Sequence, residues 1–392
     1  MILANNVGEF FIEFFQSTGF AAFFADGGWK NLIMILIALL LLYLAVFRGA
    51  EPYLLIPMGF GMLLANFPGS TEIFNTTVNA TTGETEYSGL LGVLYLGVKY
   101  EIYPCLIFLG IGATTDFGPL IANPKTLILG AAAQIGIFAT FLMAILFGFN
   151  GTEAASIGII GGADGPTAIL TTTKLAPSLL SSIAIAAYSY MALVPFIQPP
   201  VIRLLTTKKE RMIHMEELKP VSKTKKIIFP ILVTVIVVLL VPSCAPLIGC
   251  LMFGNLVKES GIVPKLVEAC SNTLLYAVTI LLGLTVGATA QASTFLTVQT
   301  LYIFILGICA FILATAGGVL IGKLMCVLTH GKINPMIGAA GVSAVPMAAR
   351  VVQKEGQRED PSNFLLMHAM GPNVAGVIGS AVCAGLFIQM LG

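Results

Sequence analysis

Asp164 has the sequence setting that most clearly suggests chemistry. It lies in the run GGADGP (161–166), inside a long stretch that is apolar and rich in glycine. Glycines and a proline interrupt a helix, and they free carbonyl groups that need partners. In the middle of a membrane a charged side chain costs about 2.5–3.5 kcal/mol, so it persists only with a partner or in a wet cavity. A carboxylate beside unpaired carbonyl oxygens could bind a hard cation or a proton, and the structural alternative is a helix cap.

A second interruption lies in the last apolar segment, in the run GPNVAG (371–376) around Asn373. The corresponding segment of the first half of the chain carries Tyr188 and Tyr190. A neutral amide and a phenol near one carboxylate suit a monovalent cation, because a divalent cation usually recruits several carboxylates. The alternatives are an interhelical hydrogen bond for Asn373 and a position at the membrane interface for Tyr188.

The glycine-rich stretch 334–351 has no acidic residue. Where the first stretch has Asp164, this one has Ala344 beside Ser343, with Asn334 at its start and Arg350 at its end. The guanidinium of an arginine is permanently charged and matches a carboxylate in shape. We therefore read Arg350 as a candidate anion-binding residue, and snorkelling to the membrane interface is the simpler alternative.

Composition identifies the environment in which these residues work. Of 392 residues, 57% are apolar and only 10% are Asp, Glu, Lys or Arg, whereas about 25% are charged in a soluble globular protein. This excludes a soluble enzyme. A net charge of +1 without a basic stripe excludes binding to nucleic acid, and the scattered cysteines and histidines have no zinc or haem spacing.

Apolar windows predict ten membrane spans, in two sets of five. The first set is near 31–47, 52–67, 101–115, 126–149 and 182–204, and the second near 228–242, 245–256, 273–289, 298–322 and 363–390. Residues 1–30, with many phenylalanines among acids, are expected to lie at the membrane interface. The stretch 203–226 holds eight of the twenty Lys and Arg residues. The positive-inside rule therefore places a basic linker, 205–227, in the cytoplasm.

Alternating the spans outward from this linker gives a consistent topology. All basic residues then fall inside except Lys30, Lys99 and Lys174, provided that 154–175 and 334–351 are re-entrant hairpins. For the linker itself a solvated topology anchor is the expected role, and docking of an acidic partner is the alternative.

The two halves also repeat. LGIGAT (109–114) matches LTVGAT (284–289), IGIIGGADGPTA (157–168) aligns with IGAAGVSAVPMA (337–348), and PMGFGMLLANF (57–67) aligns with PLIGCLMFGNL (246–256). We expect an all-α polytopic membrane protein with inverted repeats, 31–204 and 228–392, each with one re-entrant hairpin. Such folds bind ions or substrates near the midplane, where broken elements meet.

The longest runs are similar to those of a known family. They are GGADGPTAI (161–169), INPMIGAAGVSAVPMAARV (333–351), GPNVAGVIGSAV (371–382), FLGIGATTDFGPLIANP (108–124) and AYSYMALVPFIQPP (187–200). The chain resembles the β-subunit family of sodium-translocating, biotin-dependent oxaloacetate, glutaconyl-CoA and methylmalonyl-CoA decarboxylases.

This resemblance implies a membrane subunit of a sodium pump. A carboxyltransferase subunit would load CO2 onto biotin on a mobile biotinyl carrier domain or subunit. The carboxybiotin, which is not attached to this chain, would lose its CO2 at the cytoplasmic face with consumption of a proton, and the free energy would drive sodium out. A small membrane-anchoring subunit, membrane lipid and further copies of the chain are expected partners. The expected location is the plasma (inner) membrane of a prokaryote.

The resemblance also carries over functional positions. They match Asp164, Tyr190, Asn334, Gly338, Ser343, Arg350 and Asn373 in this sequence. Asp164 and Asn373, with backbone carbonyls, are expected to hold sodium, and Ser343 and Tyr190 to be oxygen ligands or proton carriers. Arg350 and Asn334, with Gly338, are expected to receive carboxybiotin. The expected catalytic residues are Asp164, Tyr190, Arg350 and Asn334, and the proton donor stays open between Tyr190 and Asp164.

A sodium-coupled secondary transporter of carboxylates is the rival hypothesis, with Arg350 binding a free dicarboxylate. Fold arguments do not separate the two functions, because inverted repeats and broken hairpins serve both. The family motifs favour the decarboxylase subunit. A channel is disfavoured, because the sequence has no repeated motif that could form a selectivity filter.

Overall fold

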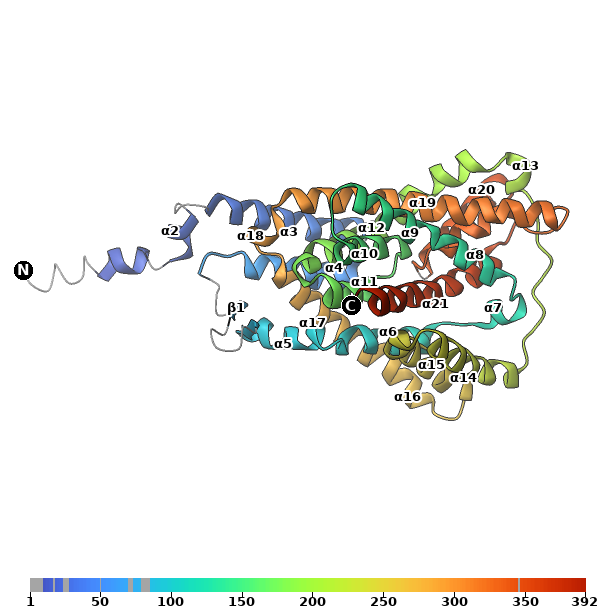
Figure 1. Ribbon diagram of the computed structural model, residues 1–392, viewed down its shortest axis with the longest axis horizontal. Helices are drawn as coiled ribbons and strands as arrows, with labels where there is room; N and C mark the ends of the chain where they lie inside the picture. Colours follow the sequence, from blue (N-terminus) through green and yellow to red (C-terminus); the bar gives the residue numbers. More distant parts are fainter. Residues whose placement is uncertain are drawn as a thin grey trace, which may run out of the picture. The chain divides into compact units, whose positions relative to one another are not determined.

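The computed structural model describes residues 10–16, 18–23, 28–49, 51–69, 73–78, 85–344 and 346–392. Helices make up most of these residues, as Figure 1 shows. The strands β1 (Asn75–Val78) and β2 (Thr85–Ser88) form a small antiparallel hairpin, in which Asn75 lies opposite Ser88. The described part of the chain is therefore helical except for this hairpin and the connecting segments.

Six helical stretches are long and apolar enough to cross a membrane. They are α3 (Gly28–Arg48), Thr126–Leu146 (α8 and α9), Pro177–Leu205 (mostly α12), Pro264–Thr289 (α16 to α17), α19 (Val298–Leu328) and α21 (Leu366–Leu391). The pair α5 (Leu90–Lys99) and α6 (Ile102–Thr114), bent by 65°, makes a seventh if it is one span. This confirms the prediction of an all-α polytopic membrane protein.

The other three predicted spans are also helices, but they are too short or too highly charged at one end to count as membrane-crossing helices. They are α4 (Pro52–Ala65), α14 (Lys223–Leu240) and α15 (Ala245–Ser260), with 14, 18 and 16 residues. At 1.5 Å per residue α4 is about 21 Å long, shorter than the apolar layer of about 30 Å. Three lysines occupy the first turn of α14. The ten predicted segments are therefore all helical, but they differ in their ability to cross a membrane.

The chain folds into two compact units, and each combines segments from both halves of the sequence. The first comprises residues 1–100 and 279–300, and the second comprises 101–278 and 301–392. In the first unit α4 packs tightly on α17 (Leu275–Thr289), because a Cβ atom on Gly61 would lie 2.1 Å from the carbonyl oxygen of Leu284. Asn66 closes this contact by donating to the carbonyl of Ala290 over 2.7 Å.

In the second unit α15 packs on α6 in a similar way. A Cβ atom on Gly112 would lie 1.9 Å from the carbonyl oxygen of Leu251, and one on Gly254 would lie 2.0 Å from that of Leu109. Asn255 donates to the carbonyl of Thr115 over 3.2 Å. In the alignment of the two halves Asn255 corresponds to Asn66, and Thr115 to Ala290. The same amide-to-carbonyl contact therefore occurs once in each unit.

Helix α21 contributes many buried side chains to the core of the second unit. It packs against α8 (Thr126–Ala133), α11 (Gly165–Leu175), η6 (Pro335–Gly341) and α20 (Met347–Glu359). Glycines and alanines in α21 allow this close packing: a Cβ atom on Gly376 would lie 2.1 Å from the carbonyl oxygen of Gly341. Helix α21 thus connects both interrupted segments that the sequence singled out.

The linker 205–227 is folded onto the second unit along part of its length. It contains α13 (Lys208–Arg211) and an extended segment before α14. Arg203, at the end of α12, pairs with Glu355 over 2.6 Å, and Arg211 pairs with Glu359 over 2.8 Å. Both acids belong to α20. The first part of the linker is therefore held on α20 rather than solvated on all sides.

The expected interfacial segment 1–30 is described only in part, because residues 1–9, 17 and 24–27 lie outside the described residues. Residues 10–16 are helical, and Phe10, Phe11, Phe14 and Phe15 are exposed. Such a helix presents a large apolar surface, which is typical of a segment at a membrane surface.

Candidate functional site

The first interrupted segment is a helix, a break and a second helix. Helix α10 (Gly151–Gly158) continues as the short 3-10 turn η2 (Ile159–Gly162), and α11 follows at Gly165. Between them Ala163 has a left-handed backbone, with φ 55°, and Asp164 is extended. A left-handed alanine is unfavourable, and such strain is commonly found where a site needs it. The break places Asp164 directly before α11.

The second interrupted segment breaks in a different way. The 3-10 helix η6 ends at Gly341, residues 342–344 are extended or bent, and α20 begins at Met347. Asn334 starts η6, and its side-chain oxygen accepts a hydrogen bond from the backbone N–H of Met336 over 3.0 Å. Ser343 therefore lies in non-helical backbone, as Asp164 does.

The two breaks meet each other. The backbone N–H of Ser343 donates to the carbonyl of Gly162 over 3.1 Å, two residues before Asp164. Asn373 of α21 donates through Nδ2 to the carbonyls of Ala340 and Val342, both over 2.9 Å. We call this meeting point of the two breaks and α21 the junction. The structure thus brings Asp164, Ser343 and Asn373 to one buried place.

At the junction Asp164 is 6% exposed, and two hydroxyl groups donate to one oxygen of its carboxylate. Its Oδ2 accepts hydrogen bonds from Thr167 Oγ1 over 2.6 Å and from Ser380 Oγ over 3.0 Å. Sequence reasoning missed both donors. Thr167 lies three residues after Asp164, in the same motif. Ser380 lies seven residues after Asn373, about two helical turns, so Asn373 and Ser380 share one face of α21. That spacing is a signal that could have found Ser380.

Three oxygen atoms near the junction have no hydrogen-bond partner within the described residues, although they are buried. They are Asn373 Oδ1, Ser343 Oγ and Gln134 Oε1. Gln134, which sequence reasoning also missed, is anchored through Nε2 to the carbonyls of Gly130 and Gly376. Buried polar atoms are normally paired, so each orphan needs an explanation, and a bound ion is one. One carboxylate and three neutral oxygens suit a monovalent cation.

The described part of the chain has no group of three or more His, Cys, Asp or Glu side chains that could hold a metal ion. A transition-metal site of nitrogen and sulfur ligands therefore finds no support there. The oxygen-rich junction is the candidate ion site.

Tyr190 lies in another part of the second unit. Its hydroxyl donates to the carbonyl of Phe304, and its ring packs on Phe311. The neighbouring Tyr188 is the tyrosine at the junction, because a Cβ atom on Gly165 would lie 2.1 Å from the Tyr188 ring. A glycine is required after Asp164 to leave room for that ring.

The other predicted residues belong to the second segment but not to the junction. Asn334 is buried, and its Nδ2 donates to the linker carbonyls of Arg211 over 3.1 Å and Ile213 over 2.9 Å. Gly338 allows η6 to approach α19, because a Cβ atom there would lie 2.0 Å from the carbonyl oxygen of Gly318. Arg350 is exposed on α20 and has no ion pair within the described residues. Its guanidinium is therefore available to an anion.

Comparison with known proteins gives one consistent family. Residues 30–391 match the family model described as "Na+-transporting oxaloacetate decarboxylase beta subunit". The chain is 56% identical over 377 residues to the beta subunit of glutaconyl-CoA decarboxylase from Acidaminococcus fermentans, with 96% of each chain covered. It is 54% identical over 394 residues to the beta subunit of methylmalonyl-CoA decarboxylase from Propionigenium modestum, covering 97% of this chain and 99% of the relative. It is 50% identical over 412 residues to the oxaloacetate decarboxylase beta chain of Klebsiella pneumoniae, covering 92% and 95%.

Proposed function

Because the chain belongs to the family of Na+-transporting oxaloacetate decarboxylase beta subunits, we propose that its junction is the sodium site of the pump. The chain is a sodium-transporting decarboxylase subunit, and the rival function, uptake of a free carboxylate with sodium, is not favoured. Two tasks then fall to its residues, which must bind the sodium ion and must receive the carboxylated biotin.

The sodium site consists of Asp164, Asn373 and Ser343, with Gln134 as a further oxygen ligand. The observation that carries the proposal is the hydrogen bond from Ser343 N–H to the Gly162 carbonyl, which joins the two breaks beside the buried carboxylate of Asp164. Sodium would take the place of the missing partners of the three orphaned oxygens. Thr167 and Ser380 orient the carboxylate through its Oδ2 atom.

The inverted-repeat architecture is part of this proposal. The equivalent contacts of Asn66 with Ala290 and of Asn255 with Thr115 support it, because an internal two-fold symmetry predicts such a pair. Under this architecture 154–175 and 334–351 are re-entrant hairpins, and their tips approach the middle of the membrane from opposite sides.

Carboxybiotin, when it is bound, supplies the carboxylate that leaves as CO2, while the protein binds and orients it. Arg350 is exposed and fits that anion by charge and shape. Asn334 donates its amide hydrogens to two linker carbonyls, and Gly338 allows η6 to pack closely on α19. In this proposal both residues act by shaping the cytoplasmic face. Tyr190 is held by Phe304, and a role as proton carrier would require that hydrogen bond to open.

The linker 205–227 lies in the cytoplasm in this proposal, because it is the most basic part of the chain. The biotinyl carrier would approach this face, and the carboxyltransferase and a small membrane-anchoring subunit would complete the assembly in the plasma membrane. The relatives are subunits of decarboxylases for three different substrates, and their identities to this chain are similar. We therefore assign the choice of acyl substrate to another subunit.

The test uses the complex reconstituted in inverted vesicles. We expect decarboxylation that depends on sodium, is blocked by avidin and is accompanied by sodium uptake into the vesicles. Transport of a free carboxylate down a sodium gradient by the purified chain without biotin would overturn the proposal.

A further inference from the structure

Two cysteine thiols meet between α6 and α15, away from the junction. Cys105 lies on α6 and Cys250 on α15, and a side-chain hydrogen bond joins their sulfur atoms. Both are free cysteines, and both are half-buried. A single cysteine in a membrane helix usually behaves as a small apolar residue. Two thiols in contact can also react with each other.

The packing of the two helices explains why the thiols meet. Four residues further along each helix, a Cβ atom on Gly254 would lie 2.0 Å from the carbonyl oxygen of Leu109. Residues four apart share one face of an α-helix, so Cys105 and Cys250 lie in the same interface, one turn from this close approach. Both contacts have the same separation in sequence, so the two helices run in the same direction. Backbone contacts therefore fix the positions of the two thiols.

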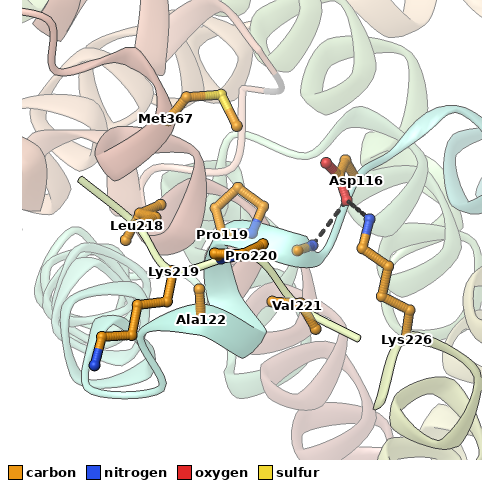
Figure 2. A pocket seen from close by; sticks show the side chains of 10 residues that line it. Asp116, Pro119, Ala122, Leu218, Lys219, Pro220, Val221, Lys226 and Met367 are labelled. Atoms are coloured by element: carbon orange, nitrogen blue, oxygen red, sulfur yellow. Dashed lines mark hydrogen bonds and ion pairs between the residues drawn. The ribbon is translucent and has the colours of Figure 1, made fainter. Parts of the chain in front are cut away.

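The other end of this helix pair is held by polar contacts. Lys258 of α15 donates to the carbonyl of Thr115, directly after α6, over 2.9 Å, and Asn255 donates to it over 3.2 Å. Figure 2 shows a further contact close to this end, in which Lys226 of α14 donates to Asp116 over 3.2 Å. Ammonium groups and an amide thus hold one end, and the thiols lie toward the opposite end.

The thiols lie toward the outer end of the helix pair in the topology that belongs to the proposed function. In that topology Lys99 falls outside and Lys258 falls on the cytoplasmic side. Cys105 follows Lys99 by six residues, and Cys250 precedes Lys258 by eight residues, about 12 Å along α15. Disulfides form and persist outside the cytoplasm, where thiols are not kept reduced. The pair is therefore on the side where oxidation is expected.

The repeat of the two halves does not require these cysteines. In the alignment of the halves, Cys250 corresponds to Gly61 and Cys105 to Ile280. A glycine and an isoleucine thus occupy the equivalent positions of the helix pair in the first unit. The two thiols are an addition to one half of the chain rather than part of the shared packing.

We infer that Cys105 and Cys250 form a redox-active thiol pair, which a peroxide oxidises to a disulfide that covalently joins α6 to α15. One thiol attacks hydrogen peroxide and becomes a sulfenic acid, with release of one water molecule. The second thiol attacks that sulfur, the S–S bond forms, and a second water molecule leaves. The thiols lose two electrons and two protons in total, and the peroxide is reduced to water. Hydrogen peroxide is small and uncharged, so it can reach a half-buried pair.

The disulfide is expected to stabilise the chain without blocking the pump. The two helices are already in backbone contact, so the bond would hold an arrangement that exists without it. A disulfide between residues more than a hundred positions apart strongly restricts the unfolded chain. The unfolding temperature of the oxidised chain should lie about 4–8 °C above that of the reduced chain. Turnover of the reconstituted complex should stay unchanged.

The test uses the purified full chain with a specific protease site inserted after Glu217, an exposed residue of the linker. After treatment with hydrogen peroxide and cleavage, the two halves should migrate together on a non-reducing gel and separate when a thiol reductant is added. Cys105 is the only cysteine before the linker, so any link between the halves must use it. Peptide mapping by mass spectrometry identifies its partner.

Matched variants remove one thiol at a time. Cys105→Ser and Cys250→Ser should each abolish the link. Cys309→Ser, which changes another half-buried cysteine, and Cys244→Ser, which changes a buried one six residues before Cys250, should keep it. Turnover of the reduced Cys250→Ser complex checks that this variant folds.

Each outcome decides the matter. A link that requires both Cys105 and Cys250 and raises the unfolding temperature supports the proposal. Halves that separate after peroxide treatment, or a link that persists in Cys250→Ser, overturn it. A linked chain that unfolds no later than the reduced one would refute the stabilising role. The link is measured without sodium or biotin, so its outcome is independent of the proposed sodium site.

Discussion

The two interrupted segments both place a polar residue in non-helical backbone, but they break differently and carry different chemistry. In the first, Asp164 keeps a carboxylate buried, with two hydroxyl groups donating to its Oδ2 atom. In the second, Ser343 contributes a neutral oxygen that has no hydrogen-bond partner among the described residues, and the charge, on Arg350, is exposed on the following helix. The difference indicates that neither segment is a complete site, because the first lacks neutral ligands and the second lacks the counter-charge for a cation.

The packing contacts of the molecule are more symmetric than these segments. Asn66 and Asn255 make the same kind of contact in the two units, each with a backbone carbonyl of the partner helix. Structural contacts can stay alike in both halves, since both helix pairs need the same close packing. The proposed site for a single monovalent cation needs only one carboxylate, and this fits the lack of an acidic residue in the second segment.

The largest expected effect follows removal of the charge of the first segment. Asp164→Asn should abolish decarboxylation and sodium transport together, by at least about 100-fold, since even residues that only support a metal ligand cost 10–100-fold. Turnover and sodium uptake in vesicles measure it. Glu153→Gln is the control from the same segment, because a glutamine can still cap α10. Sodium-stimulated turnover in Asp164→Asn would contradict the assignment.

Asn373→Ala tests helix α21, which contacts both interrupted segments. It removes a proposed ligand and leaves the carbonyls of Ala340 and Val342 without their donor, a loss of about 1–3 kcal/mol for each buried group. Sodium affinity and thermal stability should both fall, the affinity by at least about tenfold. Sodium titration and thermal unfolding measure the two effects.

Asn363→Ala is the matched control, because that amide also donates to two carbonyls, those of Arg211 and Ile213. It should lower stability and leave sodium affinity unchanged. An equal loss of sodium affinity in both variants would show that the effect of Asn373 is structural.

Ser343→Ala separates binding from stability in the second segment. Its hydroxyl makes no hydrogen bond within the described part of the chain, so the free energy of unfolding without sodium should stay the same or rise slightly. Sodium affinity should fall by about threefold to tenfold, because one neutral ligand of several is lost. An unchanged sodium affinity would exclude this hydroxyl from the site.

Arg350→Lys tests the charge of the second segment. Lysine keeps the positive charge but loses the forked geometry, so turnover with carboxylated biotin should fall by about tenfold while sodium affinity stays unchanged. Lys354→Arg, an exposed position on the same helix, is the control. Unchanged turnover and unchanged apparent affinity for the biotinyl partner in Arg350→Lys would argue against a role for Arg350.

The smallest effect concerns the attachment of the linker to the end of α20. Hydrogen bonds from Ser362 and His214 lower the pKa of Asp360 to about 2. A carboxyl group with a lowered pKa stabilises the fold above its unfolded pKa, and this contribution is lost as the pH falls through the folded pKa. The difference in unfolding temperature between the parent chain and Asp360→Asn should therefore be flat from pH 8 to 5 and shrink below about pH 4. A difference that is largest at low pH would contradict this assignment.

Residue type and spacing were enough to single out the most unusual members of the proposed site. A carboxylate in an apolar, glycine-rich run is costly, so Asp164 was recognisable, and the breaks around Ser343 and Asn373 were recognisable from Gly and Pro. Thr167, Ser380 and Gln134 were missed because such residues are common in membrane helices and their roles depend on neighbours from other segments. Tyr188 rather than Tyr190 lies at the junction, because helix rotation decides which of two nearby tyrosines faces Gly165.

Composition by itself determined that this chain is a membrane protein, since so few charges cannot cover a surface in water. The glycine and proline pattern determined where its helices break, because these residues act on the local backbone. Only the tertiary structure decided that the two breaks meet and that the carbonyl of Gly162 accepts a hydrogen bond from the backbone N–H of Ser343. These are contacts between residues more than a hundred positions apart, and they depend on how helices pack rather than on local sequence.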